Sequence, residues 1–125
     1  MSIEFEETEQ RELVQTVFLV LGHWDIEPND QAILLGLPQG TRARALAKYR
    51  MGNALPDESG FLQRAHYLLS IHNAVGTFFP GNPTAANYWV TTRSPAFGGQ
   101  APLDIMRADG VDGMRRVLDH LNGVY

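Results

Sequence analysis

The sequence predicts an all-α protein: a small helical protein of about six to eight helices. Apolar residues recur at helical spacing in every apolar segment, which is the pattern of a helix with one buried face. No segment alternates apolar and polar residues in the way of a half-buried strand. Glycine and proline, 12 and 7 of the 125 residues, divide the apolar runs into short pieces. We therefore expect helices packed around one core or in two small subdomains, without a β-sheet.

The composition is that of an ordinary globular domain, with 44% hydrophobic and 19% charged residues. The chain has no cysteine, which excludes disulfides and thiolate metal sites. Its longest apolar run, residues 17–22, is too short to cross a bilayer. The acidic start SIEFEETEQ is the opposite of a basic signal-peptide start. A cytoplasmic protein that does not enter the membrane is the expectation.

Charge is distributed unevenly along the chain, whose net charge is −4. Residues 1–30 carry eight acidic residues and only one basic residue, Arg11. Residues 31–125 carry nine basic and six acidic residues. The acidic excess is therefore an N-terminal feature, and the rest of the chain can hold a basic patch.

The first helix is expected over residues 9–21, with Thr8 as its N-cap and residues 1–8 outside it. Gly22 and the residues after it end this helix, and Trp24 is expected to cover the helix end as part of the core. The next two helices are shorter. One covers residues 29–35 and ends at Gly36.

The third helix is expected over residues 42–51, with Thr41 as its cap. Two short helices joined by a few residues that include glycine are typical of a helix-turn-helix. This helix has no acidic residue and carries four cations: Arg42, Arg44, Lys48 and Arg50. Contacts from such cations to phosphates dominate nucleic-acid affinity, so DNA binding is one interpretation. The other is a solvated polar face, because the helix's alanines leave few side chains that could read base edges.

The longest helix is expected over residues 61–79, after a loop over residues 53–60 in which Asp57 is a possible cap. Its continuous apolar stripe makes it the backbone of the core. Asn82 caps a short helix over residues 84–90, with Pro83 at its first position. That helix carries Trp89, whose simplest role is core packing, although a partly buried tryptophan can also shape an interface from beneath.

The last two helices begin at Pro102 and at Val111. The final helix is expected over residues 111–121, with Gly110 and Gly113 breaking the pattern around it and its apolar face turned inward: Val111, Met114, Val117, Leu118 and Leu121. No base lies near a nucleophile in the sequence, and His66 and His72 lack the spacing of helical metal ligands. We expect no enzyme, no metal and no cofactor. Residues 87–121 instead offer a shaped, mostly apolar surface suited to recognition.

This last stretch resembles a known family. Trp89, then SPAFGGQAPLDIM at residues 94–106, then Gly110 and MRRVLDHL at residues 114–121 are similar to the C-terminal toxin-binding domain of the Xre/MbcA/ParS antitoxins. The pattern FGG-x-x-PL-x-x-M at residues 97–106 is fairly specific, because two glycines, a proline and apolar residues keep fixed offsets. Residues 34–56 also resemble the N-terminal part of that family, so that the resemblance covers most of the chain from about residue 30.

The resemblance implies a helix-turn-helix-like N-terminal domain over residues 1–79 and a toxin-binding domain over residues 80–125. It implies a type II antitoxin that inhibits a RES-domain, NAD-consuming toxin by occluding its active site. It also implies a homodimer that binds its own operator as an autorepressor. The expected DNA contacts are the four cations of the third helix. The expected toxin contacts are Trp89, Phe97, Gly98, Gly99, Arg115, Arg116 and Tyr125. The chain's last residues, from position 122 onward, are expected to take part as well.

The sequence also leaves open two other classes of function. The first is a DNA-binding transcriptional regulator whose C-terminal domain serves only dimerisation. This regulator shares the helix-turn-helix signal with the antitoxin but has no toxin partner. An adjacent reading frame that encodes a RES-type protein would therefore favour the antitoxin. The second is an enzyme, which the sequence supports least, because its serines and histidines show no recognisable catalytic arrangement.

Overall fold

The all-α prediction is confirmed. A computed structural model describes residues 3–38, 40–51 and 58–123 of the chain. These residues form seven α-helices and one 3₁₀ turn, and their only strand-like feature is an isolated bridge between Ser94 and Gln100. The elements in order are α1 Ile3–His23, α2 Pro28–Leu34, α3 Ala43–Arg50, α4 Glu58–Phe78, α5 Pro83–Trp89, the 3₁₀ turn η1 Pro95–Phe97, α6 Pro102–Asp109 and α7 Val111–Leu121.

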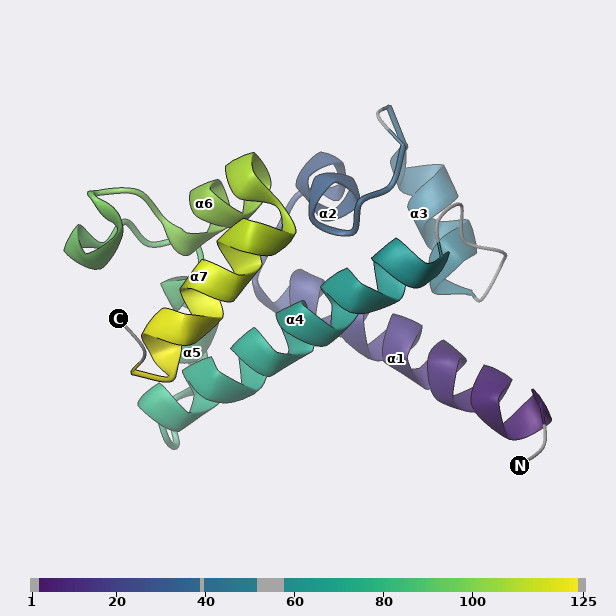
Figure 1. The fold of residues 1–125 in the computed structure, drawn as a ribbon, viewed down its shortest axis with the longest axis horizontal. Coiled ribbons are helices and arrows are strands. Elements are labelled where there is room, and N and C mark those ends of the chain that lie inside the picture. The colour runs from purple at the N-terminus through teal and green to yellow at the C-terminus, as the bar shows by residue number, and fades with distance from the viewer. Residues whose placement is uncertain (1–2, 39, 52–57, 124–125) are drawn as a thin grey trace.

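Helix α4 runs through the middle of the molecule (Figure 1) and packs against α1 and against α7. Helix α6 packs on α7, and α2 packs on both α3 and α6. A single cluster of buried side chains connects all of these layers. Its largest members, all fully buried, are Trp24, Phe61, Leu21, Leu34, Leu35, Leu46, Leu68, Ile71, Ile105, Met106, Met114 and Val17. The cluster continues on both sides of the expected domain boundary at residues 79 and 80, and that boundary stays a prediction.

Helix α1 begins earlier than the sequence indicated. The expected N-cap at Thr8 is wrong, because Thr8 lies inside the helix, which starts at Ile3. The regular apolar pattern starts at Leu13 and Val14, which pack in the core, and it did not mark the earlier turns of the helix.

Helix α1 ends at His23, and the chain turns away from it at Asp25, whose backbone is left-handed with φ 56°. The Asp25 N–H donates to the carbonyl of Gly22 over 3.0 Å, and the Ile26 N–H donates to the carbonyl of Leu21 over 3.2 Å. These two bonds close the helix in the manner of a Schellman motif. Trp24 is buried under this end, as predicted, and its ring lies 6.5 Å from that of His72. Burial, and secondarily the neighbouring His23, lowers the pKa of His72.

Replacing Asp25 with glycine is expected to stabilise the protein by roughly 0.5 kcal/mol, because glycine adopts a left-handed backbone without the steric cost of a Cβ. Thermal unfolding of the two proteins measures the difference. Asp25→Ala is the matched control: it also removes the carboxylate but keeps the Cβ. It should lower the melting temperature, and an equal rise in both variants would assign the effect to charge.

The connection between α2 and α3 takes residues 35–42. It is longer than the turn of about three or four residues that joins the helices of a standard helix-turn-helix. The expected cap at Thr41 is also wrong. Arg42 occupies the N-cap position without a side-chain cap bond, and the Thr41 hydroxyl donates instead to the carbonyl of Pro38. The helix-turn-helix interpretation stays a prediction.

Helices α4 and α5 follow the sequence closely. Asn82 caps α5 as predicted, its Oδ1 accepting from the backbone N–H of Ala85 over 3.1 Å, and Pro83 opens the helix. Helix α4 was expected to be the longest, but α1 equals it at 21 residues. Asp57, the suggested cap of α4, lies outside the described residues.

Helices α6 and α7 approach each other very closely at Gly113. The sequence suggested that Gly113 breaks the helical pattern, and this is wrong, because it lies buried within α7. A Cβ at this position would come within 2.4 Å of the backbone oxygen of Ile105. Only glycine therefore allows α7 to pack on α6 at this distance. Gly110, with φ 60°, makes the sharp turn between the two helices.

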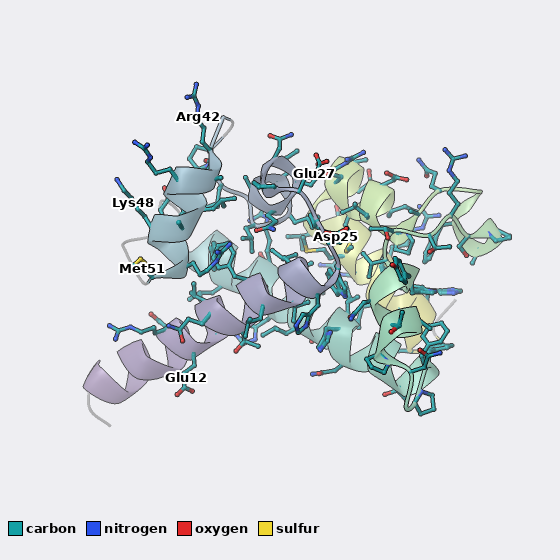
Figure 2. The ribbon with its side chains drawn as sticks, turned by 180° about the vertical axis from the view of Figure 1, so that it is seen from behind. Glu12, Asp25, Glu27, Arg42, Lys48 and Met51 are labelled. Carbon is teal, nitrogen blue, oxygen red and sulfur yellow. The ribbon has the colours of Figure 1, made fainter. Side chains whose placement is uncertain are left out.

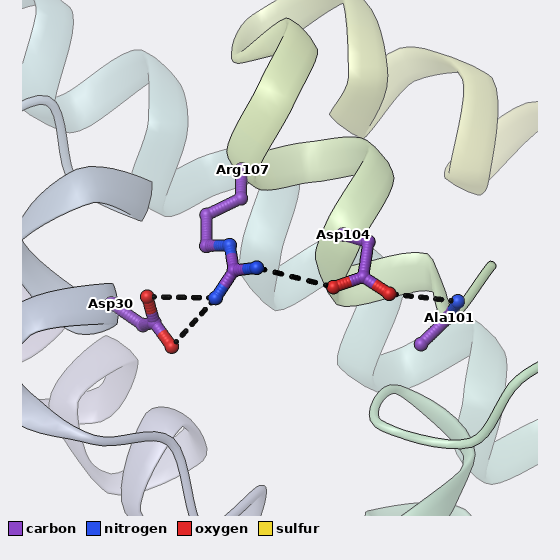
Figure 3. A network of polar contacts seen from close by, with 4 residues as sticks. All are labelled: Asp30, Ala101, Asp104 and Arg107. Atoms are coloured by element: carbon purple, nitrogen blue, oxygen red, sulfur yellow. Dashed lines mark hydrogen bonds and ion pairs between the residues drawn. The ribbon is translucent and has the colours of Figure 1, made fainter.

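An ion pair joins α6 to the neighbouring helix α2 (Figure 3). One guanidinium nitrogen of Arg107 lies 3.1 Å from both carboxylate oxygens of Asp30, and the other lies 3.3 Å from Asp104. Asp104 also accepts from the Ala101 N–H over 3.1 Å, which holds the start of α6. The Arg107 side chain is exposed, so the pair stabilises the fold by at most ~1 kcal/mol.

None of the helices in the described ranges combines the length and the apolar character needed to cross a membrane.

Candidate functional site

The loop after α5 holds Phe97 in a fixed place. The Ser94 hydroxyl accepts from the Ala96 N–H over 3.3 Å, and the Ser94 N–H donates to the Gln100 carbonyl over 3.1 Å, closing the loop. Gly98 and Gly99 have φ values of 67° and 85°, which L side chains rarely adopt. The two glycines are exposed and serve the turn itself. The result is that Phe97, although in a loop, is only 3% exposed.

Phe97 is surrounded by three partners. The Trp89 ring lies edge-on with its centroid 6.2 Å from that of Phe97, and the His120 ring lies 4.9 Å away. The guanidinium carbon of Arg116 lies 5.8 Å from the Phe97 centroid, in cation–π range. Trp89 is half-buried in this cluster, so the expected core role is confirmed. It supports Phe97 from beneath.

A groove of about 520 Å³ opens beside this cluster, between η1 and α7. Phe97 and Ala96 contribute apolar surface. The charged and polar side chains that line it all come from α7: Asp112, Arg115, Arg116, Asp119 and His120. A groove with an aromatic residue and both signs of charge is suited to bind a protein surface that carries charged side chains.

Arg115 is fixed between two helices. Its Nε donates to the Tyr67 hydroxyl of α4 over 3.3 Å, and one of its terminal nitrogens lies 3.6 Å from Asp112. The bond to Tyr67, with smaller contributions from Asp112 and Asp119, raises the pKa of Arg115. The guanidinium stays charged and exposed while its direction is restrained, which lowers the entropy lost when a partner binds it.

Of the site residues named from the sequence, the structure brings together Phe97, Arg115 and Arg116 in the groove and places Trp89 behind them. Gly98 and Gly99 form the adjoining turn. Tyr125 lies outside the described residues. The sequence reasoning missed Ala96, Asp112, Asp119 and His120. The α7 residues could have been found, because Asp112, Arg116 and Asp119 recur at helical spacing and His120 lies four residues after Arg116.

The family comparison concerns this same part of the chain. Residues 74–125 match the model of the antitoxin Xre/MbcA/ParS C-terminal toxin-binding domain. Residues 74–125 belong to this family. A comparison of the whole chain with curated proteins finds no match.

The Xre/MbcA/ParS toxin-binding domain therefore takes in the last turn of α4 together with α5, η1, α6 and α7. Every residue that lines the groove lies within it. Its helices α6 and α7 are held against the N-terminal part of the chain by α2 and α4. The resemblance noted in the sequence is thus confirmed for these residues.

The four cations named as DNA contacts lie outside the toxin-binding domain and differ from one another. All four are exposed. Figure 2 shows Arg42 and Lys48 projecting from α3 away from the rest of the molecule. Arg50 turns back onto α1, with its guanidinium carbon 5.1 Å from the centroid of Phe18. Arg50 therefore has a packing role, whatever α3 binds.

Proposed function

We propose that this chain is the antitoxin of a type II toxin–antitoxin system, and that it inhibits a RES-domain, NAD-consuming toxin by occluding the toxin's active site. The observation that carries the proposal is that the groove beside Phe97 is built entirely from residues of the toxin-binding domain. An inhibitory binding role, rather than catalysis of its own, is the activity proposed for the chain.

The chemistry of α7 supports occlusion. A cleft that binds a dinucleotide presents donors to the phosphates and acceptors to the sugar and base hydrogens. The groove has groups that complement both kinds: the carboxylates of Asp112 and Asp119 accept hydrogen bonds, and the guanidinium groups of Arg115 and Arg116 donate them. Phe97 adds an aromatic anchor of the kind that contributes most to protein interfaces.

The test is NAD consumption by the toxin encoded beside this chain, measured as the chain is added. We expect complete inhibition near equimolar amounts. If the chain occludes the active site, raising the NAD concentration must raise the amount of chain needed for half inhibition. Undiminished NAD consumption with an excess of folded chain would end the proposal. Inhibition that does not depend on NAD concentration would retain the antitoxin and reject occlusion.

A second activity is binding to operator DNA as a homodimeric autorepressor. Arg42 and Lys48, which project from α3, favour it. Because each neutralised phosphate releases counterions, replacing Arg42, Arg44 and Lys48 with alanine should lower the slope of log affinity against log salt by about three units. Fluorescence anisotropy with the promoter DNA measures this. Arg11→Ala on α1 is the control and should leave the slope unchanged, whereas an unchanged slope in the triple variant would show that α3 does not contact the DNA.

The alternative is a regulator whose C-terminal domain serves only dimerisation, and it predicts different results for groove variants and for the neighbouring toxin. It requires that changes in the groove abolish the dimer, and that no neighbouring toxin is inhibited. Size-exclusion chromatography of the chain, alone and with the toxin, separates the two.

A further inference from the structure

Tyr67 ties a residue of the groove beside Phe97 to a part of the chain outside the toxin-binding domain. It lies on α4, before residues 74–125. Helices α4 and α7 lie side by side (Figure 1) and pack on each other. The Tyr67 ring is partly buried and packs against the core, which holds its hydroxyl in place on α4. That hydroxyl accepts from Nε of Arg115, a groove residue of α7, over 3.3 Å.

The bond to Tyr67 determines which edge of the Arg115 guanidinium is free. A guanidinium can grip two oxygens at once with Nε and one terminal nitrogen, or with its two terminal nitrogens. Tyr67 occupies the first edge. On the second edge, one terminal nitrogen lies 3.6 Å from Asp112, and the other has no hydrogen bond or ion pair among the described residues. Asp112 is 85% exposed, so its attraction is screened by water and a partner can displace it.

The two arginines of the groove are restrained by different means. The guanidinium of Arg116 lies against Phe97, which belongs to the toxin-binding domain itself. Arg115 is held at Nε by Tyr67, which does not. A long exposed side chain samples many rotamers and loses this freedom when a partner orders it. A hydrogen bond that already holds the side chain reduces that loss, so the strength of the groove depends in part on a residue outside the domain.

We propose that Tyr67 is a positioning residue for toxin binding, whose hydroxyl holds Arg115 so that its two terminal nitrogens meet a carboxylate of the toxin. This inference rests on the proposed function, in which a toxin binds the groove beside Phe97. A carboxylate is the side-chain group of a protein partner whose two oxygens match this edge of a guanidinium. Tyr67 acts through Arg115 and does not contact the toxin.

The first variant is Tyr67→Phe in the full chain, with affinity for the intact neighbouring toxin measured by calorimetry. It removes the hydroxyl and keeps the ring that packs against the core. We expect about a fivefold loss of affinity, which is the scale of ordering one side chain with many rotamers, and unchanged helicity by circular dichroism. Tyr49→Phe on α3 is the matched control. Tyr49 is also partly buried but does not line the groove, so affinity should change less than about twofold.

A double-mutant cycle with Arg115 separates positioning from an effect on the fold. Arg115→Ala alone should weaken binding by about tenfold or more. Adding Tyr67→Phe to it should cost less than about twofold, because the hydroxyl then has no side chain to hold. Arg115→Lys keeps the charge but lacks the planar fork, so its affinity should lie closer to that of Arg115→Ala than to wild type.

Three results overturn this inference and leave the proposed function standing, provided that the wild-type chain still inhibits the toxin. The first is wild-type affinity in Tyr67→Phe. The second is wild-type affinity in Arg115→Ala. The third is an equal loss from Tyr67→Phe with and without the Arg115 side chain, which would assign Tyr67 to the fold or to a direct contact. A wild-type chain that does not bind the toxin at all overturns both proposals.

Discussion

Arg116→Glu is expected to weaken toxin binding by about thirtyfold or more, equivalent to at least ~2 kcal/mol, while the fold stays intact. The guanidinium of Arg116 lies beside Phe97 and lines the groove, and its side chain is exposed. Charge reversal removes the donors and places a carboxylate beside Asp112 and Asp119, which repels acidic groups of the partner. Titration of the toxin with wild-type and variant chains, followed by NAD consumption, measures the loss.

The matched control is Arg11→Glu, an equal charge reversal at an exposed position of α1 that does not line the groove beside Phe97. Its inhibition should differ from wild type by less than about twofold. Circular dichroism must show the same helicity in all three proteins. Should Arg116→Glu inhibit as well as wild type, the groove beside Phe97 is not the toxin-binding surface, although the family assignment of residues 74–125 stands.

Gly113→Ala is expected to destabilise the protein by about 2–4 kcal/mol, because the new Cβ would clash with the Ile105 backbone oxygen 2.4 Å away. Backbone cannot rotate aside as a flexible side chain does, so α6 and α7 must separate. The gain in helix propensity, up to ~1 kcal/mol, is too small to compensate. Denaturant unfolding followed by circular dichroism gives the change in free energy.

The same substitution at Gly76 in α4 is the control. A Cβ there meets open space, so Gly76→Ala should stabilise the protein by up to ~1 kcal/mol through helix propensity alone. The two variants are therefore expected to shift stability in opposite directions. A stabilised Gly113→Ala would show that α6 and α7 are free to separate at no cost.

The helices were predictable because the residues that determine each helix lie close together in the sequence. Asn82 and Pro83 mark the start of α5 by their own chemistry, and the apolar positions of α7 follow one helical face. Some helix starts were less accessible: Thr8 resembles a cap but lies inside α1, which begins at Ile3, and Thr41 resembles a cap but bonds to Pro38 instead. Capping residues are recognised by type, whereas the bond they form depends on the path of the whole loop.

The groove beside Phe97 was predictable in part. Its arginines and Phe97 could be named because the family pattern marks them, but their contacts join distant segments. Arg115 bonds to Tyr67, 48 residues earlier, and no local spacing reports such a pair. Gly113 illustrates the same limit: the sequence shows a glycine in a helix, while the reason for it lies in the backbone of Ile105.

The central position of α4 couples binding at α7 to the stability of α1. Because α1 and α7 pack on the same helix around one core, neither can unfold fully without exposing the other. A partner bound only at α7 therefore lowers the population of states in which α1 is open. At a free partner concentration of 100 times Kd, the free energy of global unfolding rises by about 2.7 kcal/mol. The slowest-exchanging amide protons of α1 would then exchange about a hundredfold more slowly in the complex, without any contact between the partner and that helix.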